Sequence, residues 1–110
     1  MIKVRNIRTH KKDDSIAIKI DRSSVLGNPF YMSDESKRDE VCDKYEEYFN
    51  DKVEHEIEHG GYFIRELYRI LNITKDNDVT LLCWCYPKRC HGETIKRWIE
   101  EKLKEMGIGR

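Results

Sequence analysis

The sequence predicts a single α/β domain in which about three strands are flanked by three to four helices. Short segments with an apolar residue at every second position occur beside longer segments whose apolar residues recur at helical spacing. At 110 residues the chain can build one modest core but not two. Residues 1–110 are therefore expected to fold as one domain.

Two strands are expected near the N-terminus. Alternation over Ile2–Ile7 predicts the first strand, and three isoleucines at every second position within Ser15–Asp21 predict the second. A hairpin is the simplest topology for these two strands. Its polar connection, residues 9–15, would be longer than the usual two to five residues.

A fixed turn is expected in the irregular segment that follows the second strand, residues 22–32. Gly27 permits a positive φ angle there. Pro29 directs Asn28 away from the helical region, so Gly27-Asn28-Pro29-Phe30 should adopt one conformation.

The first helix is expected to begin after this turn. Ser36, with Asp39 three residues later, resembles a capping box, and apolar residues at helical spacing continue to about Asn50. Arg38 would project from the inner edge of this helix near its start. Residues 51–59 have helical propensity but few apolar side chains.

The remaining elements follow Gly60-Gly61, which is expected to break or kink the helical run. A second helical stripe continues to Asn72. The apolar run Val79–Trp84 predicts a central strand that is buried on both faces. A last helix, Glu93–Met106, is expected to place five apolar residues on one face: Ile95, Trp98, Ile99, Leu103 and Met106.

Charge and hydropathy exclude several classes of protein. The 21 basic residues balance the 21 acidic ones, which argues against general nucleic-acid binding but leaves a local basic patch open. No segment resembles a signal peptide or a membrane span, so we expect a cytoplasmic protein with no membrane association. In that reducing compartment the four cysteines are expected to be thiols, metal ligands or redox groups.

The segment Cys83–Gly92 holds three of the four cysteines and one of the four histidines. It lies between an expected strand and an expected helix, where backbone N–H groups point outward and the helix dipole favours negative charge. The segment therefore predicts a functional site, for which three interpretations remain open.

In the first interpretation the segment forms a ligand pocket. Cys90 lies near a helix N-terminus and beside Lys88, Arg89 and His91, surroundings that would lower the pKa of its thiol. His91 would accept a proton or contact an anion. If the pocket is catalytic, Cys90 and His91 are the candidate catalytic residues.

The same interpretation gives the helix start a role in binding. Gly92 would let a ligand approach the backbone, and the N–H groups of Gly92, Glu93 and Thr94 would face that ligand. We therefore include the first two of these residues among the predicted ligand contacts.

The other two interpretations involve no reaction. In one of them Cys83, Cys85, Cys90 and His91 bind zinc as a Cys₃His site, with Cys42 as a substitute ligand. The adjacency of the last two ligands would strain such a site. In the other, small cysteines are buried on a core strand and the loop merely caps a helix.

The turn and the cysteine-histidine segment are expected to form one site. Ligands of open α/β sheets gather beyond the carboxyl ends of parallel strands. If the second strand runs parallel to Val79–Trp84, an arginine of the turn region or of the first helix could hold a phosphate or carboxylate. The predicted ligand-binding residues are Arg22, Gly27, Asn28, Pro29, Phe30, Arg38, Cys85, Gly92 and Glu93.

These two stretches together resemble the domain of unknown function 4326 family, small proteins of phages and bacteria. The resemblance runs from about Ile18 to Ile99. The residues that carry it are Arg22, Leu26–Phe30, Arg38, Tyr45, Leu82–Cys85, Pro87 and Cys90–Gly92. It implies a compact, Rossmann-like α/β fold in which the two motifs form one site, and it implies no activity.

The leading hypothesis is a domain that binds a small anionic ligand, either a nucleotide or a nucleotide-derived metabolite. A phage origin would place it in the host cytoplasm. The alternative is a zinc-stabilised binding or interaction module without catalysis. A third hypothesis is that the acidic helical segment Glu46–Glu58 engages a host protein. The sequence leaves open whether the protein is an enzyme.

Overall fold

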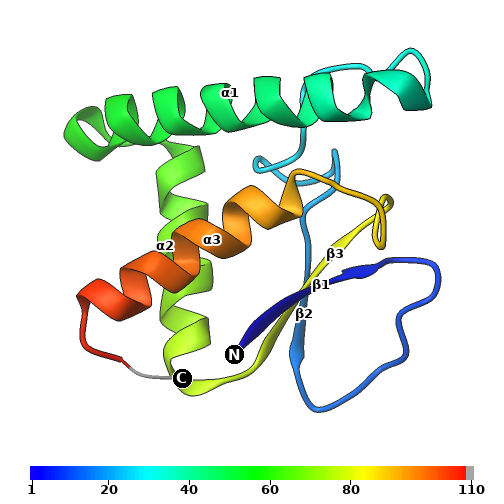
Figure 1. Ribbon diagram of the computed structural model, residues 1–110. Coiled ribbons are helices and arrows are strands. Elements are labelled where there is room, and N and C mark those ends of the chain that lie inside the picture. The colour runs from blue at the N-terminus through cyan, green and yellow to red at the C-terminus, as the bar shows by residue number, and fades with distance from the viewer. Residues whose placement is uncertain (109–110) are drawn as a thin grey trace.

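Three parallel strands form the sheet of the computed structural model, which describes residues 1–108 (Figure 1). They are β1 (Ile2–Asn6), β2 (Ile16–Lys19) and β3 (Val79–Cys83). The strand order is β1-β3-β2, so β3 lies in the centre. Every residue of β3 is buried, as its apolar sequence predicts, whereas β1 buries only Ile2 and Val4 and β2 buries only Ile18.

The first two strands do not form the expected hairpin. Each pairs with β3, with Ile2 and Ile16 both opposite Val79. The connection between them passes on the side of the sheet away from the helices (Figure 1), where Ser15 Oγ lies 2.6 Å from Thr80 Oγ1. The hairpin prediction is wrong because the uninterrupted β3 needs neighbours on both edges and separates the two half-buried strands.

The first helix, α1 (Arg38–His59), follows a 3₁₀ turn over Glu35–Lys37. Asp34 caps that turn by accepting a hydrogen bond from Ser36 N at 2.8 Å, so the expected capping pair of Ser36 with residue 39 is not used. The helix continues beyond the expected end near residue 50 and stops at Gly60, whose φ of 80° ends the run.

The second helix, α2 (Tyr62–Asp76), is joined to α1 through a buried carboxylate. Glu56 Oε1 accepts a hydrogen bond from Ile64 N at 3.0 Å, which satisfies one of the free N–H groups at the start of α2. The helix ends four residues beyond the expected Asn72. The sparse segment 51–59 is thus held in helical form by its contact with the next helix.

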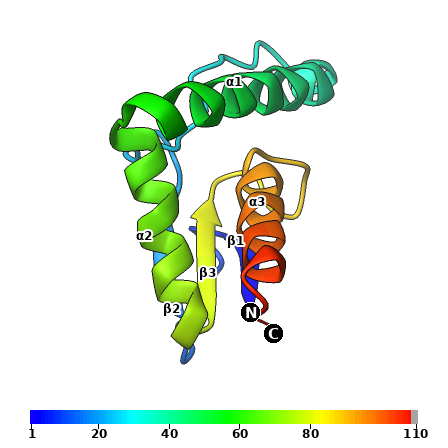
Figure 2. The ribbon, with the colours of Figure 1, turned by 90° about the vertical axis from the view of Figure 1, so that its left-hand side faces the viewer.

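The last helix, α3 (Gly92–Glu105), lies beside α2 on one face of the sheet, while α1 lies across the carboxyl ends of the strands (Figures 1 and 2). Met106 is 45% exposed, so the expected apolar stripe of this helix ends at Leu103. The chain turns away at Gly107, which has a φ of 74°.

One core joins the sheet to all three helices, and it confirms the α/β class with three strands and three α-helices. Its largest fully buried side chains include Tyr45, Phe49, Phe63, Leu67, Leu81 and Ile99. Among residues 1–108, no helix combines the length and the apolar character needed to cross a membrane.

Candidate functional site

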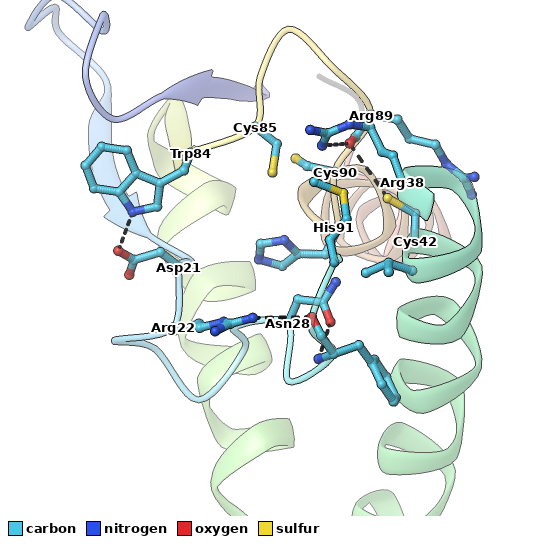
Figure 3. Close-up of a pocket in the computed structure, with 13 residues that line it drawn as sticks. Asp21, Arg22, Asn28, Arg38, Cys42, Trp84, Cys85, Arg89, Cys90 and His91 are labelled. Carbon is cyan, nitrogen blue, oxygen red and sulfur yellow. Dashed lines mark hydrogen bonds between the residues drawn. The ribbon is translucent and has the colours of Figure 1, made fainter. Parts of the chain in front are cut away.

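The turn region and the cysteine-histidine loop line one cavity beyond the carboxyl ends of β2 and β3. The cavity has a volume of about 280 Å³ and is bounded on one side by the start of α1 (Figure 3). Its lining residues are Asp21, Arg22, Asn28, Phe30, Met32, Arg38, Val41, Cys42, Trp84, Cys85, Arg89, Cys90 and His91. The fold thus brings together two segments that lie more than fifty residues apart in the sequence.

The predicted ligand-binding residues divide into two groups. Those that line the cavity are Arg22, Asn28, Phe30, Arg38 and Cys85. Those outside its lining are Gly27, Pro29, Gly92 and Glu93. Both candidate catalytic residues, Cys90 and His91, are in the lining.

The turn places an amide and a guanidinium group at the cavity. Asn28 Oδ1 accepts a hydrogen bond from Phe30 N at 2.9 Å, which fixes the side chain and directs its amide nitrogen into the cavity (Figure 3). Arg22 Nη2 donates a long hydrogen bond to Phe30 O at 3.4 Å. Arg22 has no ion pair within the described residues, so its charge is uncompensated by a carboxylate.

Gly27 has a role different from the expected one. Its φ angle is not positive. Instead, a Cβ atom there would lie 2.4 Å from Asp21 O and 2.8 Å from Arg22 Cα. Gly27 is therefore required for a close approach between two backbone segments, which positions Arg22 at the cavity.

Arg38 joins the start of α1 to the loop before α3. Its Nη1 donates to Arg89 O at 2.9 Å, and its Nη2 donates to Glu35 at 2.5 Å. Glu35 also accepts from Lys88 Nζ at 2.6 Å, so one carboxylate links both segments. The Nε atom of Arg38 is buried and has no partner among residues 1–108. A buried donor without a partner is unusual and needs an explanation.

Arg89, which also lines the cavity, is engaged by acidic residues of α1. Its guanidinium donates to Asp39 at 3.1 Å and to Asp43 at 2.8 Å. These exposed ion pairs hold the loop against α1, and they leave the Arg89 guanidinium with its charge already paired. Arg89 therefore contributes less to the charge of the cavity than Arg22 does.

Cys90 is not the activated thiol that its sequence context predicts. It is buried, and its Sγ lies 3.2 Å from the Sγ of buried Cys83. The contact with Cys83, together with burial, raises the pKa of Cys90. The pKa of Cys83 is lowered because the Cys90 thiol and the backbone N–H groups of Tyr86 and Cys85 stabilise its thiolate.

The two other cysteines lie nearer to the open part of the site. Cys42 is buried, which raises its pKa, and its Sγ lies 3.7 Å from Arg89 O. Cys85 is only half-buried and lies beside the Arg38 guanidinium, whose pKa it helps to raise. Cys85 is therefore the most accessible thiol of the cavity.

His91 is buried at the base of the cavity. Its Nε2 lies 2.5 Å from Ile20 O, and because a carbonyl oxygen only accepts, Nε2 carries the proton and Nδ1 is the free acceptor. Its ring meets the ring of Tyr45 edge-on at 5.0 Å. Burial lowers the pKa of His91, so the imidazole is neutral and does not attract an anion by charge.

The expected backbone donors at the start of α3 are occupied. Gly92 N lies 3.4 Å from Cys90 Sγ, Glu93 N donates to Cys90 O at 3.2 Å, and Thr94 N donates to His91 O at 3.1 Å. A Cβ atom at Gly92 would lie 3.0 Å from a methyl carbon of Ile20, so this glycine allows the helix to approach the sheet. The start of α3 thus serves packing instead of facing a ligand.

The zinc interpretation receives no support from the geometry. In the part of the chain that the structure describes, no three His, Cys, Asp or Glu side chains are grouped so that they could hold a metal ion. This includes the proposed set Cys83, Cys85, Cys90 and His91. Two of these sulfur atoms are instead in contact with each other.

Trp84 and Asp21 line the cavity, which was not predicted from the sequence. Trp84 is 56% exposed, and its Nε1 donates to Asp21 Oδ2 at 3.1 Å (Figure 3). A hydrogen bond from Ser23 lowers the pKa of Asp21, so its carboxylate is ionised. Each residue is the last one of a predicted strand, and that position at the carboxyl end of the strand was the available signal. Apolar Met32 and Val41 were also missed.

Comparison with known protein families gives one match. The model of a family described as a domain of unknown function (DUF4326) matches residues 4–101, which is most of the chain. No curated protein and no solved structure matches it.

Proposed function

This chain belongs to the domain of unknown function (DUF4326) family, and we propose that it binds a small anionic, nucleotide-like ligand in the cavity. The observation that carries the proposal is Arg22, a cavity-lining guanidinium without a carboxylate partner in the described residues. Its one hydrogen bond, 3.4 Å long, is weak enough to be exchanged for a stronger contact. A phosphate or carboxylate would supply both charge and bidentate geometry.

Two further donors support an anionic ligand. The Nε atom of Arg38 is buried without a partner, and a ligand oxygen would satisfy it. The amide nitrogen of Asn28 has no partner in the described residues, because only Oδ1 is used within the turn. The three donors belong to Arg22 after β2, Asn28 in the turn and Arg38 on α1. A bound anion would therefore bridge these three segments.

The rest of the cavity favours a ligand with a flat apolar part. Trp84 exposes more than half of its surface, and Phe30, Met32 and Val41 add apolar lining. Aromatic side chains bind nucleobases by stacking, at about 1–3 kcal/mol per base. Figure 3 shows Trp84, Asp21 and Arg22 on one side of the cavity and Arg38 on the other. A ligand that places an anionic group beside the arginines and a flat ring beside Trp84 has the chemistry of a nucleotide.

If the site is catalytic, Cys85 is the thiol best placed to meet the ligand. It is half-buried beside Arg38, whereas Cys90, the sequence candidate, is buried against Cys83. His91 retains a role as acceptor through Nδ1, because its Nε2 proton is held by Ile20 O.

A thermal-shift screen against nucleoside phosphates, ADP-ribose and sugar phosphates tests the binding proposal. A ligand present at about 100 times its Kd adds about 2.7 kcal/mol of stability, which corresponds to a rise in Tm of roughly 10 °C for a domain of this size. Arg22→Ala should abolish the rise. Arg65→Ala, which removes an exposed arginine of α2, is the matched control and should preserve it.

Two results would contradict the proposal. One is that none of these anionic ligands stabilises the wild-type protein. The other is that Arg22→Ala responds to an active ligand as strongly as Arg65→Ala does.

A further inference from the structure

The face of the sheet opposite α2 and α3 carries positive charge. Alternation along β1 buries Ile2 and Val4 on the helix side, so Arg5 faces the other way. The strand register places Arg5 and Lys19 on either side of Leu82 in one row across this face. Neither cation makes an ion pair among residues 1–108: the Arg5 guanidinium donates to Val4 O at 2.7 Å, and the charge of Lys19 helps to lower the pKa of Asp21.

The connection between β1 and β2 adds further cations on the same side of the sheet (Figure 1). It carries Arg8, Lys11 and Lys12, and no ion pair compensates any of them in the described residues. Of its two acidic residues, Asp13 is already paired with Lys3 at 2.8 Å, and Asp14 makes no ion pair in the described residues. The basic surface, defined here as Arg5, Arg8, Lys11, Lys12 and Lys19, therefore has an excess of positive charge although the whole chain is neutral.

The basic surface approaches the cavity through the loop that follows β3, in which Tyr86 contacts Arg5 and Trp84 lines the cavity. Trp84 lies two positions after Leu82, just beyond the end of β3, and lines the cavity. The guanidinium of Arg5 lies over the ring of Tyr86 at 5.1 Å from its centroid. Asn6 Nδ2 donates to the backbone oxygens of both Trp84 and Tyr86, each at 3.0 Å, which holds this loop beside the strand end.

We propose that the ligand of the cavity is one nucleotide of a single-stranded nucleic acid, whose neighbouring phosphates lie along the basic surface. The inference rests on the proposed function and extends it. A free nucleotide would leave the uncompensated cations of the sheet face unused. A single strand offers both a base for Trp84 and a row of phosphates for Arg5 and Lys19.

Fluorescence anisotropy with a labelled single-stranded oligonucleotide of about 10 nucleotides tests this inference. DNA and RNA of one sequence are measured in parallel, and nucleoside monophosphates compete for the site. The oligonucleotide should bind at least about ten-fold more tightly than the monophosphate. The affinity for the oligonucleotide should fall steeply with added salt. Arg22→Ala should weaken the binding of both the oligonucleotide and the monophosphate.

The double variant Arg5→Ala/Lys19→Ala should bind the oligonucleotide about ten-fold more weakly than wild type does, and its affinity for the monophosphate should be unchanged. For this variant, a plot of the logarithm of the oligonucleotide binding constant against the logarithm of the salt concentration should have a slope that is smaller in magnitude by about one to two. The reason is that two phosphate contacts are lost. Arg65→Ala/Lys104→Ala removes the same two residue types from exposed positions on α2 and α3 and should bind like wild type. Lys19→Glu, at an exposed position, should show the same loss without disturbing the fold.

The inference is overturned if the oligonucleotide binds no more tightly than the monophosphate, or if the two double variants bind it equally well. Oligonucleotide binding that Arg22→Ala does not weaken would also overturn it, because the cavity would then be uninvolved. Failure of the proposed function is a separate result, in which the monophosphate itself does not bind to the wild-type protein.

Discussion

The Sγ atoms of Cys83 and Cys90 lie 3.2 Å apart, one at the end of the central strand and the other just before α3. Both residues are buried. The contact couples the two thiols, since a proton shared between them favours one thiolate and opposes a second. This contact accounts for two of the three cysteines in the loop.

Cys90→Ala should raise the lowered pKa of Cys83 toward the ordinary thiol value of about 8.5, because the main donor to the Cys83 thiolate is lost. The measurement is a titration of thiolate absorbance in the ultraviolet. Cys42→Ala removes a buried thiol outside the pair and should leave the low-pH step of the titration, the ionisation of Cys83, in place. A low step that persists in Cys90→Ala would show that the contact does not control this pKa.

Cys85 should react with iodoacetamide faster than the three buried cysteines, because it alone is half-exposed to solvent. Mapping the alkylated peptides over time measures the order of reaction. Cys85→Ser should remove the fast phase, and Cys42→Ser should retain it. Fastest labelling at Cys90 would instead support the thiol chosen from the sequence.

His91 should make the protein less stable as the pH falls below about 6.5. Burial lowers the pKa of His91 in the folded state, so in this range the unfolded chain binds a proton that the folded chain does not. The free energy of unfolding then decreases by up to about 1.4 kcal/mol per pH unit, until the lowered folded-state pKa is reached.

Urea unfolding at a series of pH values measures this dependence. His91→Gln keeps a donor for Ile20 O but does not titrate, so its slope between about pH 6.5 and 5 should be smaller than that of wild type. His55→Gln changes an exposed histidine of α1 and should keep the wild-type slope. Equal slopes for His91→Gln and wild type would refute the assignment.

Gly27→Ala should destabilise the protein by about 1–3 kcal/mol, because the new Cβ would overlap the backbone of Asp21 and Arg22. The displaced Arg22 should also bind the anionic ligand less tightly. Gly60→Ala is the informative comparison: it is strained by a φ of 80° but lies between α1 and α2, away from the cavity. It should lower the Tm without changing the ligand affinity, and equal affinities in both variants would contradict the role given to Gly27.

The α/β class, the central strand and the break between the first two helices could be predicted from the sequence. These features depend on local patterns: an apolar run at Val79–Cys83, alternation in the two other strands, and glycines where the helices end. The expectation that Arg22 and the Gly27–Phe30 turn lie near the cysteine-histidine loop depended on the second strand running parallel to the central strand, and the family resemblance implied it too. The two strands are parallel, and one cavity is lined by residues of both segments.

Which groups face each other could not be predicted from the sequence, because it depends on how distant segments pack together. Periodicity records whether a residue is buried, but it carries no information on the neighbour that buries it. For this reason β1 and β2 flank β3 instead of forming a hairpin, and Cys90 meets Cys83 instead of the cavity alone. The partners of Arg38, and the absence of a carboxylate partner for Arg22 in the described residues, likewise depend on distances between segments that the chain order does not fix.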